Sequence, residues 1–133
     1  MFNLKSQITI YAFMCALFFA YSAHSEQLLK YEPEVTEISG NLSKGKFQHP
    51  NGTWVEFYVL KLVNPASIVA DGVNGINESE SNVEEIQIYS SSQAIRKVLS
   101  ELLGKNVTVK GTIFHAHTAW HVRPLVMDVI EVR

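Results

Sequence analysis

Cysteine is nearly absent from this chain, which has a single one, Cys15. Cys15 lies inside an apolar run at residues 8–19, so it is lost if the N-terminus is a removable export signal. Residues 26–133 then contain no thiol. A disulfide framework and a cysteine-based metal site are therefore excluded, although exported proteins are free to form disulfides.

An excess of basic residues is also missing. The chain has 11 Lys and Arg against 13 Asp and Glu, a formal net charge of −2 at pH 7. Removal of Lys5 with the N-terminal segment makes the remainder more acidic. Proteins that hold nucleic acid through its phosphates need clustered Lys and Arg. We therefore expect no nucleic-acid binding.

Long apolar runs and the common catalytic motifs are missing beyond residue 25. No stretch there approaches the roughly 20 apolar residues of a transmembrane helix, so no membrane anchor is expected after signal cleavage. The P-loop, the HExxH motif, the nucleophile elbow and paired catalytic carboxylates are all absent. The sequence favours a non-catalytic protein and leaves an enzyme as the alternative. Residues 26–133 suit a single domain.

The N-terminus predicts a signal peptide. Lys5 supplies a positive charge, and residues 8–19 match the length of a signal's apolar core, about 7–15 residues. Small residues then form small-x-small patterns that end at Ser22 and at Ser25. We expect residues 1–25 to be cleaved after Ser25 or Ser22, and the protein to work in the periplasm or as a secreted protein. An uncleaved anchor is the alternative.

The residues after the signal predict five strands. β-Branched, aromatic and alternating residues indicate the strands, and turn signals such as His49-Pro50-Asn51-Gly52 separate them. The predicted strands cover residues 35–47, 54–63, 83–89, 107–113 and 125–132. Gly40 is expected to mark a bulge or bend, and Pro65 to end the second strand. A polar, acidic loop is predicted at residues 70–82.

A helical pattern lies between the third and fourth predicted strands. An apolar stripe with helical spacing indicates a helix over residues 93–103; its members are Ile95, Val98, Leu99 and Leu102. Ser90 with Gln93 suggests a capping box, and Gly104 a helix end. The order β-β-β-α-β-β is that of the OB-fold, a partly open barrel. We therefore predict a mostly β, five-stranded OB-like barrel, with another small α+β sandwich as the alternative.

Three histidines make residues 114–124 the most distinctive stretch. In an extended strand, His115 and His117 would point to the same side, and His121 would fold back toward them past a turn. Three imidazoles with an open fourth position suit zinc or copper. The alternatives are histidines that bond to the backbone at a hairpin rim, or an acid–base pair in an enzyme.

Aromatic residues suggest a second kind of site. OB barrels use an aromatic face to bind oligosaccharides or single-stranded nucleic acid. Such a face would be formed here by Trp54, Phe57, Tyr58 and Trp120. The alternative is that these rings are core residues. The predicted ligand-binding residues are His115, His117, His121, Trp120, Trp54 and Tyr58.

Several segments of the chain resemble one family of proteins. These segments are Val59–Pro65, the loop around Asp71, Ile86–Ile88, Leu103–Thr118 and Pro124–Val126. Over roughly residues 30–132 the chain resembles domain-of-unknown-function family 4431, a family of small exported bacterial proteins. Phe114-His115-Ala116-His117-Thr118 is the more specific part, and the sequence departs from the family after Thr118. The resemblance implies a bacterial, exported, OB-like protein, and it implies no particular activity.

These observations predict an exported binding or interaction module with an OB-like barrel. Its partner would be another protein, a small molecule or an oligosaccharide. One alternative function is a histidine-dependent metal-binding protein that holds zinc or copper at His115, His117 and His121. Another is a secreted inhibitor of a different protein.

Overall fold

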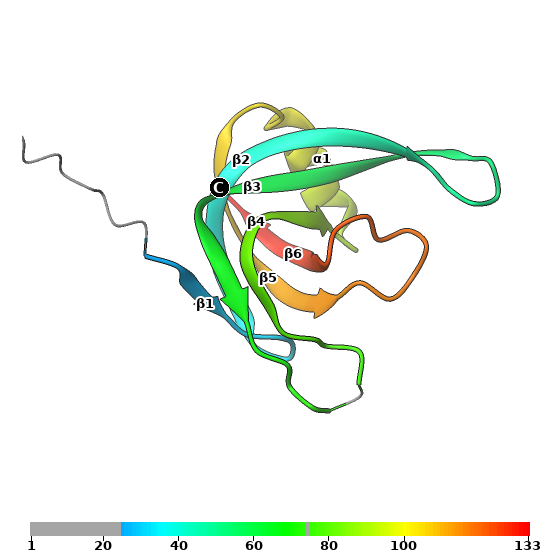
Figure 1. The fold of residues 1–133 in the computed structure, drawn as a ribbon. Coiled ribbons are helices and arrows are strands. Elements are labelled where there is room, and N and C mark those ends of the chain that lie inside the picture. The colour runs from blue at the N-terminus through cyan, green and yellow to red at the C-terminus, as the bar shows by residue number, and fades with distance from the viewer. Residues whose placement is uncertain (1–24, 74) are drawn as a thin grey trace, which may run out of the picture.

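The computed structural model describes residues 25–73 and 75–133. The predicted signal peptide lies almost wholly outside the described residues, so it stays a prediction. The elements, in chain order, are β1 (Gln27–Leu29), β2 (Val35–Gln48), β3 (Trp54–Ile68), β4 (Glu80–Tyr89), α1 (Gln93–Glu101), β5 (Asn106–His115) and β6 (Leu125–Val132) (Figure 1). The prediction of a mostly β fold with one short helix is therefore confirmed.

The strands form one sheet whose pairing returns on itself. The order is β1-β3-β2-β5-β6-β4, and β4 also pairs with β3. Each of the five longer strands therefore has at least two hydrogen-bonded neighbours, and β3 has three. The pairs β1–β3 and β4–β6 are parallel, and the other pairs are antiparallel. The sheet is strongly curved, as Figure 1 shows.

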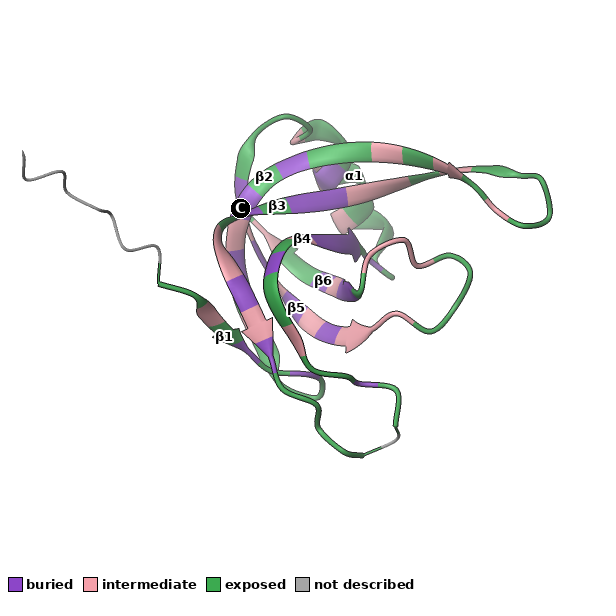
Figure 2. Ribbon diagram, in the orientation of Figure 1, coloured by how far each residue is buried: buried purple, intermediate pink, exposed green. Residues whose placement is uncertain are grey.

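The core lies on the concave side of this sheet. Buried and partly exposed residues alternate along β5, where Val107, Val109 and Ile113 are buried (Figure 2). This is the period of two that a strand imposes on its side chains. Helix α1 adds Leu99, which is fully buried, and Ile95 packs against the same cluster. The predicted apolar stripe therefore docks the helix on the core.

Strands β2 and β3 extend beyond their other partners as a two-stranded ribbon. β2 pairs with β5 only up to Asn41, and β3 pairs with β4 only from Tyr58 onwards. We call residues 43–57 the hairpin arm, which projects from the rest of the sheet in Figure 1. At its tip, the His49 amide donates to the Thr53 carbonyl at 2.8 Å. The predicted turn at residues 49–52 is therefore present.

Two glycines sit where strands approach very closely. Gly40 lies where β2 passes from β5 to β3, and a Cβ added there would be 2.2 Å from the Lys61 carbonyl oxygen. A Cβ at Gly111 would be 2.0 Å from the Asp128 carbonyl oxygen, beside a register shift in the β5–β6 pair. Only glycine leaves room for the neighbouring backbone at such positions.

The prediction that Pro65 ends the second strand is wrong. β3 continues to Ile68, and its register against β4 shifts between Lys61 and Ala66. Pro65 therefore lies at an irregularity, where the missing N–H costs no ladder bond. Beyond it, Ala66–Ile68 pair with β1, a strand that the sequence did not predict. β4 also begins at Glu80, so the loop before it ends earlier than predicted.

The start of α1 also differs from the prediction. The N-cap is Ser92, whose Oγ accepts from the Ile95 amide at 3.4 Å. Ser90 is buried instead, and its Oγ donates to the Val129 carbonyl at 2.6 Å, so it is not free for a capping box. The predicted glycine after the helix fits, since Gly104 has a φ of 80°. Among the described residues, no helix is long and apolar enough to cross a membrane.

Candidate functional site

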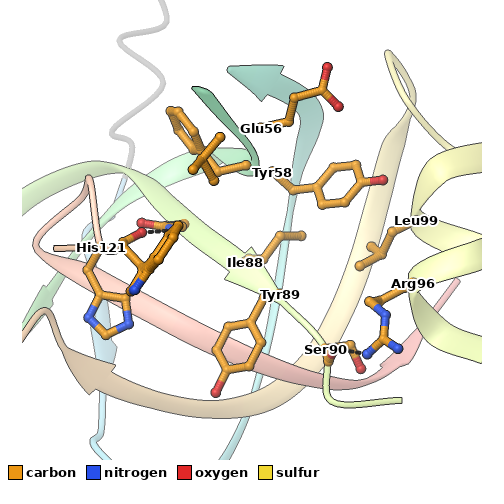
Figure 3. Close-up of a pocket in the computed structure, with 12 residues that line it drawn as sticks. Glu56, Tyr58, Ile88, Tyr89, Ser90, Arg96, Leu99 and His121 are labelled. Atoms are coloured by element: carbon orange, nitrogen blue, oxygen red, sulfur yellow. Dashed lines mark hydrogen bonds between the residues drawn. The ribbon is translucent and has the colours of Figure 1, made fainter. Parts of the chain in front are cut away.

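A cavity of about 370 Å³ opens between the hairpin arm, the end of β4, helix α1 and the loop between β5 and β6 (Figure 3). Its volume is in the usual range of small-ligand sites, roughly 300–1,000 Å³. Its lining residues are Val55–Tyr58, Gln87–Ser90, Arg96, Leu99, Trp120 and His121. The cavity lies beside the first part of β3, which begins at Trp54 but pairs with β4 only from Tyr58 onwards.

The inner wall of the cavity is apolar. Tyr58 and Ile88 are paired across β3 and β4, and Ile88 is buried. In Figure 3 the Tyr58 ring extends toward Leu99 on helix α1. A wall of this kind favours an apolar ligand surface, because burial removes that surface from water.

The outer wall is a loop that Gln87 holds in place. The Gln87 side chain is buried, its Nε2 donates to the Trp120 carbonyl at 3.0 Å, and its Oε1 accepts from the Val122 amide at 2.7 Å. Both ends of the amide are thus satisfied by the main chain of residues 116–124. The Trp120 ring in turn stacks on His49 at the tip of the hairpin arm, with centroids 3.9 Å apart. The loop and the arm are therefore connected across the cavity mouth.

The three histidines of residues 114–124 face different partners. β5 ends at His115, so strand alternation does not carry on to His117. The His115 Nε2 lies 2.8 Å from the Glu80 carboxylate. The rings of His117 and His121 are 5.0 Å apart, and each packs near the Phe114 ring. The structure thus brings His117 and His121 together and turns His115 toward β4.

The His121 ring holds its own loop through hydrogen bonds to the main chain. Its Nδ1 accepts from the main-chain amides of His117 at 3.1 Å and Thr118 at 3.3 Å, so this nitrogen carries no proton. Burial, followed by the nearby His117, lowers the pKa of His121 and favours the neutral ring. In that tautomer Nε2 holds the proton. Neither nitrogen then offers a free lone pair to a metal in this conformation.

Glu78, Glu80 and His115 are the described residues that best fit a metal ion. One potential ligand atom from each lies within 4.8 Å of the other two. The His115 Nδ1 is 3.2 Å from the Ala116 carbonyl, which directs Nε2 toward Glu80. Histidine ligands of metals commonly use their second nitrogen in this way. The group joins the end of β5 to the start of β4.

Buried polar contacts support this group. The Asn77 side chain accepts from the His115 amide at 3.0 Å and donates to Asp71 at 2.7 Å. The Tyr31 hydroxyl donates to the Glu78 carbonyl. Burial, aided by the nearby charges of Glu80, Asp71 and Glu78, raises the pKa of Tyr31 to about 12. The loop between β3 and β4 is therefore held against β5.

The cavity has one compensated and one uncompensated charge. Glu56 is 2.7 Å from the Lys44 ammonium, and this hydrogen bond lowers the pKa of Glu56. Arg96 donates from Nη1 to the carbonyls of Ser90 at 2.8 Å and Ser91 at 3.0 Å. Within residues 25–73 and 75–133, no carboxylate forms an ion pair with Arg96. The unpaired charge at the cavity is thus positive.

Half of the residues predicted to bind a ligand lie at this cavity. Tyr58, Trp120 and His121 line it, whereas His115 and His117 do not. Trp54 is also outside the lining and is 67% exposed on the hairpin arm. The sequence did not point to Gln87, Arg96 or Tyr89, which are brought there by the pairing of β4 and the docking of α1.

Most of the residues that line the cavity fall within a segment that matches one protein family. Residues 85–133 match a family model described as a domain of unknown function. We refer to residues 85–133, which are similar to this family, as the DUF4431 segment. The resemblance to this family is therefore confirmed, although the match begins at Glu85 and not near residue 30. No curated protein matches the chain.

The DUF4431 segment supplies three sides of the cavity. It contains the end of β4, helix α1 and the loop with Trp120 and His121. The fourth side, Val55–Tyr58 of β3, lies outside the match. His115 lies within the DUF4431 segment, while its partners Glu78 and Glu80 precede it.

Proposed function

We propose that the protein is an exported, non-catalytic binding module built on an OB-like barrel. The closed succession of strand pairs and the helix between β4 and β5 support the barrel. The apolar run at residues 8–19 supports export to the periplasm or the medium. The family resemblance to exported bacterial proteins agrees with this location.

The observation that carries the proposal is the cavity beside Trp120. Its inner wall is formed by Tyr58, Ile88 and Leu99, which Figure 3 shows, and Trp120 and His121 also line it. Concave apolar sites with a few polar groups are the usual form of small-molecule sites, and the mouths of β-barrels are a frequent place for them. The ligand is therefore proposed to be a small molecule with an apolar body.

Replacing Trp120 with alanine tests this proposal. We expect the exported protein to bind the neutral probe 2-naphthalenemethanol. Trp120→Ala should weaken this binding about two- to tenfold, because a lost aromatic contact is worth roughly 0.5–1.5 kcal/mol. Calorimetric titration measures both affinities. Trp54→Ala is the matched control, since Trp54 is exposed outside the cavity. The same affinity in the Trp120 and Trp54 variants, or no binding by the parent, would contradict the proposal.

Metal binding is a second candidate function, supported by the group Glu78, Glu80 and His115. Two carboxylates and one imidazole are suitable ligands for a divalent transition metal such as zinc. This set differs from the three histidines that the sequence suggested. It shares only His115 with them.

Calorimetric titration with zinc distinguishes the two ligand sets. We expect His115→Ala to abolish the binding heat, and His117→Ala to leave it unchanged. Binding should weaken in acid, because an imidazole ligand must be neutral to bind the metal. His49→Ala is the control, since His49 stacks on Trp120 at the arm tip. Equal heats from the parent and His115→Ala would exclude this site.

A further inference from the structure

We propose that the cavity selects ligands that carry a single carboxylate on an apolar or aromatic body, and that Arg96 binds this carboxylate. The inference rests on the proposed binding function and names the ligand class for the same site. It is carried by the position, the hydrogen bonds and the unpaired charge of Arg96.

The Arg96 side chain is held in position before any ligand arrives. Its Nη1 donates to two carbonyls, those of Ser90 and Ser91, immediately before helix α1. Ser90 is itself buried and bonded to Val129. Figure 3 shows the guanidinium directed to Ser90 at the edge of the cavity. Little conformational entropy therefore remains to be lost when Arg96 binds a ligand.

The remaining donors of Arg96 suit a planar carboxylate. With Nη1 occupied, the Nε and Nη2 hydrogens form the side-on edge of the guanidinium. This edge binds the two oxygens of a carboxylate through parallel hydrogen bonds. Such charge-assisted pairs are stronger than neutral hydrogen bonds. The geometry at Arg96 is therefore that of a carboxylate receptor.

The surrounding charges favour one negative charge on the ligand. Glu56 is neutralised by Lys44, so it does not oppose an anion strongly. The lowered pKa of His121 keeps its ring neutral at pH 7, so it adds no second positive charge. Arg96 is thus the single uncompensated cation among the lining residues. One cation matches a monoanion better than a multiply charged phosphate ester.

The apolar body would lie beside the same helix face. Leu99 follows Arg96 by three positions, so the two side chains are neighbours on α1. Leu99 and Ile88 are buried at the inner wall, and Tyr89 and Trp120 line the same cavity. A ligand with its carboxylate on Arg96 would place an adjoining ring against these apolar side chains.

A pair of matched probes tests the inference on the exported protein. 2-Naphthoate and 2-naphthalenemethanol share the ring system and differ in charge. We expect calorimetry at pH 7 to show at least tenfold tighter binding of 2-naphthoate. Arg96→Gln should remove this preference, because it should weaken binding of 2-naphthoate much more than binding of the alcohol. Lys97→Gln is the control, because Lys97 is exposed, faces Glu101 at 3.9 Å and does not line the cavity.

The outcomes separate the inference from the proposed function. Equal affinity of the parent for both probes would overturn the carboxylate preference and keep the binding function, whereas failure to bind either probe would contradict both. Equal loss of preference in Lys97→Gln, or displacement of 2-naphthoate by inorganic phosphate at similar concentration, would also overturn the inference. If Arg96→Gln does not fold, Arg96→Lys provides the test: a several-fold lower preference supports the inference, and an unchanged one overturns it.

Discussion

Replacing Gly111 with alanine is expected to destabilise the protein by about 3 kcal/mol or more, because overpacking against backbone cannot be relieved by a rotamer change. The added Cβ would lie 2.0 Å from the Asp128 carbonyl oxygen and 3.0 Å from the Met127 side chain. β5 and β6 would have to separate to make room. Chemical denaturation followed by circular dichroism measures the change in the free energy of unfolding.

Gly45→Ala is the matched control for this substitution. The Cβ added at Gly45 would meet the Phe57 ring, at 2.6 Å from Cζ, and not a backbone atom. A ring on the hairpin arm can rotate away, so the cost should be clearly smaller than at Gly111. Equal costs at the two positions would show that the β5–β6 backbones are not as close as the structure places them.

Leu99→Ala should lower the free energy of unfolding by about 2–5 kcal/mol, the usual cost of truncating a buried leucine. Leu99 is fully buried and is the residue through which α1 enters the core. Its loss removes apolar contact area and leaves a void beside Tyr58 and Ile88. The shift of the urea midpoint at constant slope measures the change.

Leu103→Ala provides the comparison, since Leu103 follows the helix and is partly exposed. Its truncation should cost less than about 1 kcal/mol, as is usual away from the core. A loss below about 0.5 kcal/mol for Leu99→Ala would mean that the helix contributes nothing to the core.

The strands and the helix were predictable because they carry local periodic patterns. The alternation around Val107 and Val109 and the helical stripe around Leu99 reflect which side of each element meets the core. The Asn51-Gly52 turn was predictable for the same reason, since its signal lies within four residues. Local patterns therefore predicted the order of the five longer strands and the position of the helix among them.

Other parts of the fold depend on partners far away in the chain. β1 has only three residues, too few for a pattern, and it exists because Ala66–Ile68 offer it an edge. Pro65 is tolerated because the register shifts next to it. The sequence suggested Ser90 as a helix cap, but its hydroxyl donates a hydrogen bond to the Val129 carbonyl on β6. None of these partners is visible from the neighbouring sequence.

The site was predictable only in part for the same physical reason. Trp120 and Tyr58 stood out as aromatic residues, but their position at one cavity depends on how β3 leaves β4. Strand alternation suggested a pairing of His115 with His117, yet β5 ends at His115 and its ring faces Glu80. Gln87 showed no local signal, because its role is to hold a loop over thirty residues away.

The hairpin arm has a consequence for self-association. Within the described part of the chain, the strands of the arm pair with each other and leave their outer edges open. Open strand edges are templates on which a second molecule can add a strand and start aggregation. Lys44 and Lys46 lie along the arm with Glu56 between them, and all three remain partly exposed. An incoming strand would have to strip water from these charges, so they keep a projecting ribbon from becoming a seed for fibres.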